Sequence, residues 1–128
     1  KNKILIIEDE VLILTFLQRR MEKENYDVDI ARDGSEAMDL ISKNKYDSIL
    51  VDLMLPFISG FQLIAHIRTD QKNADTPVIV VSALSNEETI VEALSMGATD
   101  FLKKPLAINV LLTKVKLLTS ESPLLYSA

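Results

Sequence analysis

The chain has 128 residues, the usual length of one domain, and 48% of them are hydrophobic and 26% charged. This apolar content excludes an intrinsically disordered chain, and no apolar run is long enough to span a bilayer. The formal net charge of −5 argues against a nucleic-acid-binding surface, and the absence of cysteine excludes disulfides and thiolate chemistry. With a single histidine, a metal site would have to use oxygen ligands and therefore a hard cation.

Five short apolar runs, each predicted to be a strand, alternate with amphipathic stretches of helical length. The runs cover residues 4–7, 28–31, 48–51, 78–81 and 99–102. Three are continuously apolar, which is typical of parallel strands buried on both faces, whereas 28–31 alternates with polar residues and suits an edge strand.

The first helix is predicted from Asp9 or Glu10 to about Glu24, with Asn25 as a left-handed stop. The other helices are predicted to follow Gly34, Gly60, either Ser85 or Asn86, and Pro105, and the fourth to stop at Gly97. The inward face of the first helix is expected to carry Val11, Leu14, Gln18 and Met21, and that of the third Phe61, Ile64 and Ile67. The apolar residues noted for the other helices are Ala37, Leu40 and Ile41 in the second; Ile90, Val91 and Leu94 in the fourth; and Ile108, Leu111, Leu112 and Val115 in the fifth.

Alternating strands and helices predict an α/β fold with a parallel sheet covered by helices on both faces. Right-handed crossovers make this a doubly wound three-layer sandwich, a flavodoxin-like (βα)5 fold with strand order 2-1-3-4-5. The winding then reverses between the first and third strands, so a ligand site is expected at their carboxyl ends.

Polar side chains follow the strands at this edge: Glu8, Asp9, Glu10, Asp52, Ser82 and the pair Lys103 and Lys104. Clustered carboxylates repel one another unless a cation intervenes, and Mg²⁺ takes oxygen ligands. A carboxylate beside Mg²⁺ can attack a phosphoryl group, whose oxygens an ammonium and a hydroxyl can hold.

Each of these residues also has a simpler explanation when it is considered alone. The three acids could only be the first turn of a helix, where the helix dipole favours them. Asp52 could be a turn residue, Ser82 a strand-end cap and Phe101 a packed strand aromatic. Convergence on one edge weakens these explanations, while His66 is interpreted as solvent-exposed on the third helix.

Four segments resemble the receiver domain of two-component response regulators. They are Ile-Ile-Glu-Asp-Glu at 6–10, Val-Asp-Leu-Met-Leu-Pro-Phe-Ile-Ser-Gly at 51–60, Val-Val-Ser-Ala at 80–83 and Gly-Ala-Thr-Asp-Phe-Leu-Lys-Lys-Pro at 97–105. The resemblance runs in order from about residue 3 to 118. We therefore expect a receiver domain over 1–118 and a tail, or the start of a linker, over 119–128.

The resemblance implies that Asp52 accepts a phosphoryl group from the histidine of a sensor kinase or a phosphotransfer domain. It also implies a site for Mg²⁺, with Mn²⁺ as the alternative, formed by Glu8, Asp9, Asp52 and the backbone carbonyl of Met54. Lys104 matches the phosphate-binding lysine, while Lys103 is expected to point to solvent.

By the same resemblance, Ser82 matches the switch hydroxyl, Phe101 the aromatic that moves with it, and Pro105 follows a cis peptide bond. Switching is expected to repack the fourth helix, fifth strand and fifth helix, for dimerisation or for control of an effector outside this chain. Leu12 and Phe16 lie four residues apart, away from the predicted inward face. They are expected to help bind the phosphodonor.

The resemblance places the domain in the cytoplasm, away from membranes, and implies that it catalyses only its own phosphorylation and dephosphorylation. One alternative is an aspartyl-nucleophile phosphatase, but such enzymes usually carry Asp-x-Asp after the first strand, whereas Asp52 follows the third. Another is an interaction module that works without phosphorylation, against which the complete set of site residues argues.

Overall fold

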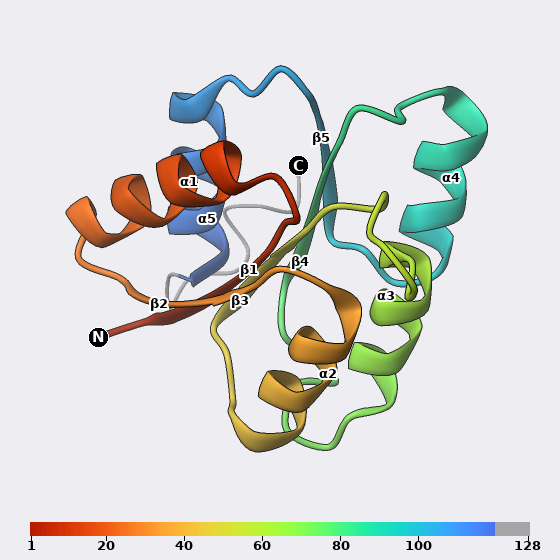
Figure 1. The fold of residues 1–128 in the computed structure, drawn as a ribbon, viewed down its shortest axis with the longest axis horizontal. Helices are drawn as coiled ribbons and strands as arrows, with labels where there is room; N and C mark the ends of the chain where they lie inside the picture. Colours follow the sequence, from red (N-terminus) through yellow and green to blue (C-terminus); the bar gives the residue numbers. More distant parts are fainter. Residues whose placement is uncertain (120–128) are drawn as a thin grey trace.

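The computed structural model describes residues 1–119, which form five strands alternating with five helices (Figure 1). The strands are β1 (Lys3–Ile7), β2 (Asp27–Ala31), β3 (Ser48–Val51), β4 (Val78–Ser82) and β5 (Asp100–Lys103). The helices are α1 (Val11–Lys23), α2 (Gly34–Lys43), α3 (Gly60–Thr69), α4 (Glu87–Ser95) and α5 (Ile108–Thr119). None of these helices has the length and apolar content needed to cross a membrane. The tail expected at 119–128 lies outside the described residues except for Thr119, which ends α5.

The five strands form one parallel sheet in the order β2-β1-β3-β4-β5, which confirms the predicted topology. β2 lies at the edge, as its alternating polar pattern predicts, and three of its five residues are only partly buried. In the central pair Ile7 lies opposite Val51, so the residues that follow these two strands leave the sheet side by side.

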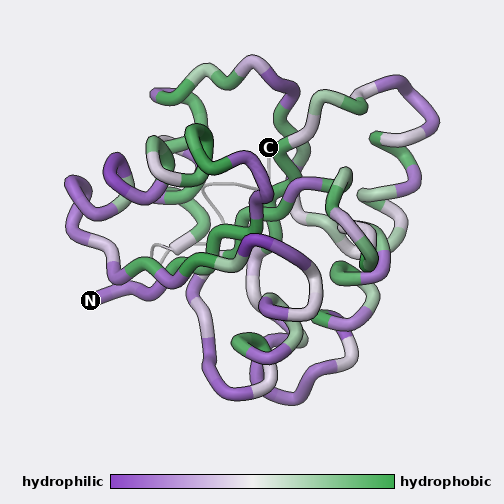
Figure 2. Tube along the Cα trace, in the orientation of Figure 1, coloured by the Kyte–Doolittle hydropathy of each residue, from purple (hydrophilic) through white to green (hydrophobic). Residues whose placement is uncertain are grey.

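Two apolar layers sandwich the sheet, because successive strand residues point to opposite faces. Ile4 and Ile6 pack with α1 and α5, whereas Leu5 and Ile7 pack with α2, α3 and α4. Figure 1 shows this division, with α1 and α5 together on one side of the strands. Figure 2 shows that the hydrophobic residues concentrate along the central strands.

The predicted inward face of α1 is wrong at its first residue. Val11 is 50% exposed, while Leu17, which the prediction omitted, is buried with Leu14 and Met21. Because α1 begins just beyond the carboxyl end of β1, its first turn has no strand beneath it, and the buried face starts one turn later.

The large apolar residues of α4 do not form its buried face, because Val91 is 55% and Leu94 is 44% exposed. Thr89 and Ala93, four residues apart, face the sheet instead, and Ile90 is partly buried. The small buried side chains let the helix lie close to the sheet and leave its larger apolar residues outside. Asn25 and Gly97 adopt positive φ values of 70° and 117° just after their helices, which confirms both predicted stops.

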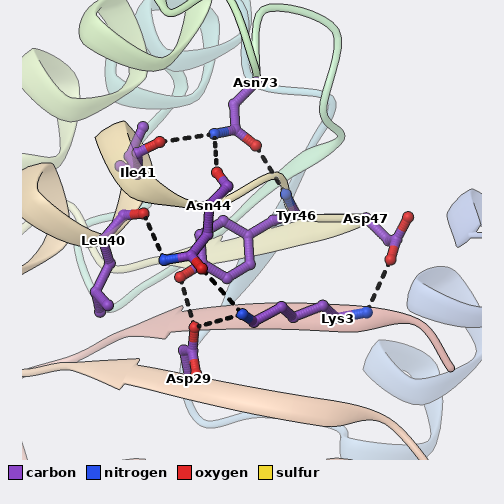
Figure 3. Close-up of polar contacts among 8 residues, drawn as sticks. All are labelled: Lys3, Asp29, Leu40, Ile41, Asn44, Tyr46, Asp47 and Asn73. Atoms are coloured by element: carbon purple, nitrogen blue, oxygen red, sulfur yellow. Dashed lines mark hydrogen bonds and ion pairs between the residues drawn. The ribbon is translucent and has the colours of Figure 1, made fainter.

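A polar network joins the loops at the amino edge of the sheet, opposite the predicted site (Figure 3). Buried Asn73 accepts a hydrogen bond from the Tyr46 N–H (2.9 Å) and donates to the carbonyls of Ile41 (3.0 Å) and Asn44 (2.8 Å). Tyr46 is itself fully buried, and its hydroxyl donates to Asp29 (2.7 Å). The loops before β3 and β4 are thus held together through one amide side chain.

We expect Asn73→Ala to lower the free energy of unfolding by about 2 kcal/mol, because it leaves buried backbone donors and acceptors unpaired. Urea denaturation followed by circular dichroism measures the change. Exposed Asn109 provides the matched control, and Asn109→Ala should change stability by less than about 0.5 kcal/mol. Equal losses in the two variants would contradict the structural role assigned to Asn73.

Candidate functional site at the carboxyl edge of the sheet

Two buried carboxylates lie next to each other where β1 and β3 end. Glu8 is 2% exposed and Asp52 is 6% exposed. The Asp52 N–H continues the strand pairing by donating to the Ile7 carbonyl at 3.1 Å. The parallel register therefore brings together two acids that are 44 residues apart in the chain.

Lys104 supplies the positive charge between these carboxylates. Its Nζ lies 2.5 Å from Oε1 of Glu8 and 2.9 Å from Oδ2 of Asp52, and its side chain is only 12% exposed. The Lys104 N–H donates to the Ser82 carbonyl at 3.0 Å, which holds the lysine beside the end of β4. One ammonium thus serves two carboxylates, and the buried group has a net negative charge.

The pKa values of these groups reflect both burial and pairing. Burial raises the pKa of Glu8, and the neighbouring charge of Asp52 raises it further, although the hydrogen bond from Lys104 opposes this. Burial alone would lower the pKa of the Lys104 ammonium, but its contacts with Glu8 and Asp52 outweigh burial and raise it. Lys104 therefore stays charged near neutral pH.

Asp9 completes an acidic cluster that fits a hard cation. Glu8, Asp9 and Asp52 each offer a carboxylate oxygen, and these oxygens lie within 4.8 Å of one another. Asp9 is exposed, so the cluster opens to solvent on that side. An all-oxygen donor set with excess negative charge matches the preference of Mg²⁺.

Backbone donors orient the two buried carboxylates. The Glu10 N–H donates to Glu8 Oε2 (3.3 Å), and the Met54 N–H donates to Asp52 Oδ1 (3.0 Å). Met54 is 58% exposed, and the role expected for its backbone carbonyl stays a prediction. The first turn of α1 contains no acidic residue, so the three acids precede the helix and do not serve as its first turn.

Gly60 supports the backbone of the site, a role that the sequence analysis did not assign to it. A side chain there would lie 2.5 Å from both the Asp52 carbonyl oxygen and the Leu53 Cα. The Gly60 N–H also donates to the Leu53 carbonyl at 3.0 Å. The start of α3 therefore packs directly on the backbone of Asp52. The sequence feature that could have indicated this close contact is a glycine placed directly after Ser59, the residue that caps the start of α3.

The other residues predicted for the site, Ser82, Phe101 and Pro105, lie outside the acidic cluster. Ser82 is fully buried, and its Oγ accepts a hydrogen bond from the Leu84 N–H (3.1 Å). Phe101 lies opposite Val80 and is partly buried against the core beneath α2, α3 and α4. The peptide bond before Pro105 is cis.

Exposure separates the remaining predicted residues. Leu12 is 87% and Phe16 is 47% exposed on α1, as expected. Lys103 is also exposed, unlike its neighbour Lys104. His66 is partly buried and so less accessible than expected.

Comparison with known proteins identifies the family to which this chain belongs. A family model for the response regulator receiver domain matches residues 4–116. The chain belongs to this family.

Curated and solved relatives of this receiver domain agree with the match. The response regulator ArlR of Staphylococcus saprophyticus is 40% identical over 122 residues, which cover 95% of this chain and 54% of ArlR. The chain thus spans about half the length of the curated relatives it matches.

Two similar solved structures contain a metal ion, and one of them also contains a phosphorylated aspartic acid. The receiver domain of the sensor histidine kinase PA1611 from Pseudomonas aeruginosa has a magnesium ion in its active site cleft. It aligns with a TM-score of 0.85 at 25% identity, over 92% of this chain and 97% of that one. A response regulator from Burkholderia pseudomallei holds a phosphorylated aspartic acid, a calcium ion and citrate. It aligns with a TM-score of 0.84 at 28% identity, over 99% of this chain and 74% of that one.

We expect Lys104→Met to destabilise this receiver domain by about 3 kcal/mol at pH 7, because it leaves two buried carboxylates unpaired. The loss should shrink towards pH 4. A carboxyl whose pKa is raised by folding destabilises the fold only above its unfolded pKa, and Glu8 has such a raised pKa. Urea denaturation at both pH values, without added metal, measures the effect.

The adjacent exposed residue provides the control for this experiment. Lys103→Met removes the same charge outside the cluster and should change stability by less than about 0.5 kcal/mol at either pH. A loss in Lys104→Met that does not depend on pH would show that the buried carboxylates are not its cause.

Proposed function

We propose that this receiver domain accepts a phosphoryl group on Asp52 from the histidine of a sensor kinase or phosphotransfer protein, in a Mg²⁺-dependent reaction. The observation that carries the proposal is the buried Asp52 carboxylate, which shares the Lys104 ammonium with Glu8 in an acidic cluster open to solvent. The phosphorylated aspartic acid of the related Burkholderia regulator supports the same chemistry.

In the proposed transfer, a carboxylate oxygen of Asp52 attacks the phosphorus atom. A phosphorus–oxygen bond forms as the bond from phosphorus to the donor imidazole breaks, and the electron pair returns to the ring nitrogen. Lys104 balances negative charge that accumulates on the phosphoryl oxygens. Mg²⁺, when held by Glu8, Asp9, Asp52 and the Met54 carbonyl, supplies the further positive charge that this group lacks.

The structural change caused by phosphorylation would begin at the carboxyl ends of β4 and β5. We propose that the Ser82 hydroxyl turns towards the phosphoryl group and that Phe101 moves into the space released. The face formed by α4, β5 and α5 would then repack for dimerisation or effector control. Its exposed apolar residues, Val91, Leu94 and Val110, support a role in association.

This function implies a cytoplasmic domain that acts on itself and does not turn over a separate substrate. The effector would lie outside residues 1–119, and the domain itself would contact neither nucleic acid nor a membrane. The family match disfavours the phosphatase alternative, and the complete acidic cluster with Lys104 disfavours a module that works without phosphorylation.

We expect incubation with acetyl phosphate and Mg²⁺ to add the mass of one phosphoryl group to the intact chain, because the small donor needs only the acceptor site. Asp52→Asn should remain unlabelled, while Asp39→Asn, at an exposed acid on α2, should be labelled normally. Intact mass spectrometry measures both. Labelling of Asp52→Asn at the native rate would rule out Asp52 as the acceptor.

We expect Phe16→Ala to slow transfer from an autophosphorylated sensor kinase by about tenfold, as for an aromatic residue central to an interface. Labelling by acetyl phosphate should stay unchanged, because Phe16 lies on the outer surface of α1. Rapid-quench kinetics measures the transfer, and Asp39→Ala, at an exposed site on α2 to which no role is assigned, is the control. An unchanged transfer rate would remove Phe16 from the docking surface.

A further inference from the structure

Arg68, at the end of α3, is a charged residue that the proposed phosphoryl chemistry does not use. Its Nε and Nη2 donate to the Gly97 carbonyl at 3.0 Å and 2.7 Å. Its Nη1 donates to the carbonyls of Ala74 (3.0 Å) and Thr76 (2.7 Å). One guanidinium therefore joins the end of α3 to the loop before β4 and to the loop between α4 and β5.

The chemistry of the guanidinium makes this connection strong. Burial lowers the pKa of Arg68, so the group has lost part of its contact with water, but an arginine stays charged near neutral pH. Hydrogen bonds from a charged donor are stronger than those between neutral groups. All of these bonds end on backbone carbonyls, and Arg68 therefore holds the backbone of the two loops in place.

Gly97 is shaped to receive this side chain. The residue has a φ of 117°, and a side chain there would place its Cβ 2.9 Å from both Cγ and Nε of Arg68. Two residues later, the Thr99 N–H donates to the Val78 carbonyl (2.7 Å), and the Thr99 hydroxyl accepts from the Val78 N–H (3.0 Å). The segment that follows α4 is thus bonded to both α3 and β4.

The opposite end of α4 is bonded only to its own surroundings. The Asn86 side chain accepts from the Thr89 N–H (2.8 Å), and the Leu84 N–H donates to Ser82 Oγ (3.1 Å). Apart from this bond to Ser82, no hydrogen bond or ion pair within residues 1–119 joins residues 83–88 to another strand or helix. The two ends of α4 are therefore held very differently.

This difference has a consequence when the Ser82 hydroxyl turns towards a phosphoryl group on Asp52. The turn withdraws the acceptor of the Leu84 N–H and so releases the segment that leads into α4. The bonds of Arg68 lie at the amino edge of the sheet, away from Asp52, and none of them involves Ser82. A change that begins at Ser82 therefore reaches the start of α4 and leaves its end bonded to α3.

We propose that Arg68 is a positioning residue that fixes the C-terminal end of α4, so that phosphorylation displaces only the N-terminal end of the helix. Gly97 is then the pivot, in keeping with the location of hinges at the ends of helices and strands. The proposal rests on the proposed function and adds to it which end of α4 moves and which side chain prevents the other from moving.

Hydrogen–deuterium exchange of the native chain, with and without labelling by acetyl phosphate and Mg²⁺, tests the pivot directly. We expect labelling to change exchange at the amides of residues 83–90 and to leave residues 96–99 unchanged. An equal change at both ends, or no change at residues 83–90 in the labelled chain, would overturn the pivot.

Arg68→Met tests whether the guanidinium is the cause, because it removes the donors and keeps an unbranched apolar stem. Without labelling, the amides of residues 96–99 should exchange at least about tenfold faster, since the loops lose hydrogen bonds to a charged group. On labelling, the change should spread from residues 83–90 to residues 96–99. Arg19→Met, at an exposed arginine on α1, should behave as the native chain does.

The outcomes separate this proposal from the proposed function. Failure of acetyl phosphate to label the native chain would contradict the proposed function itself. Faster exchange in Arg68→Met with the labelling response still confined to residues 83–90 would show a merely structural role and overturn the proposal. Arg68→Lys has one donor group for three carbonyls, so it should show an intermediate spread, and it replaces Arg68→Met if that variant does not fold.

Discussion

The carboxyl edge of the sheet depends on one imbalance, two buried carboxylates that share one ammonium. Lys104 lies between Glu8 and Asp52, and the exposed acid Asp9 adds negative charge beside them. Buried charges are costly unless each is paired. The group is therefore short of positive charge, which a hard cation can provide.

The fold produces this imbalance through backbone pairing. The register of β1 with β3 places Glu8 beside Asp52, and the carbonyl at the end of β4 holds the backbone of Lys104. α1 and α3 then depart to opposite faces of the sheet, and exposed Asp9 is the acid through which the cluster reaches solvent. Gly60 lets α3 start against the backbone of Asp52, and Phe57 in the preceding loop is exposed.

The two edges of the sheet differ in how their polar groups are satisfied. At the amino edge, Asn73 and Tyr46 have hydrogen-bond partners within the chain, and these bonds stabilise the loops there. At the carboxyl edge the charges are incompletely balanced. Among the helices, α4 fully buries only the small residues Thr89 and Ala93. The satisfied polar groups and the unbalanced charges thus lie at opposite ends of the strands.

The sequence by itself determined the strands, their order and the edge that carries the acids, because apolar runs and alternation are local patterns read residue by residue. It also indicated Asp52 and Lys104 through motifs. Tertiary structure alone decided that Val11, Val91 and Leu94 face outwards, that Lys104 bridges both carboxylates, and that Phe57 is displayed at positive φ. These features depend on contacts between segments far apart in the chain, which no local pattern records.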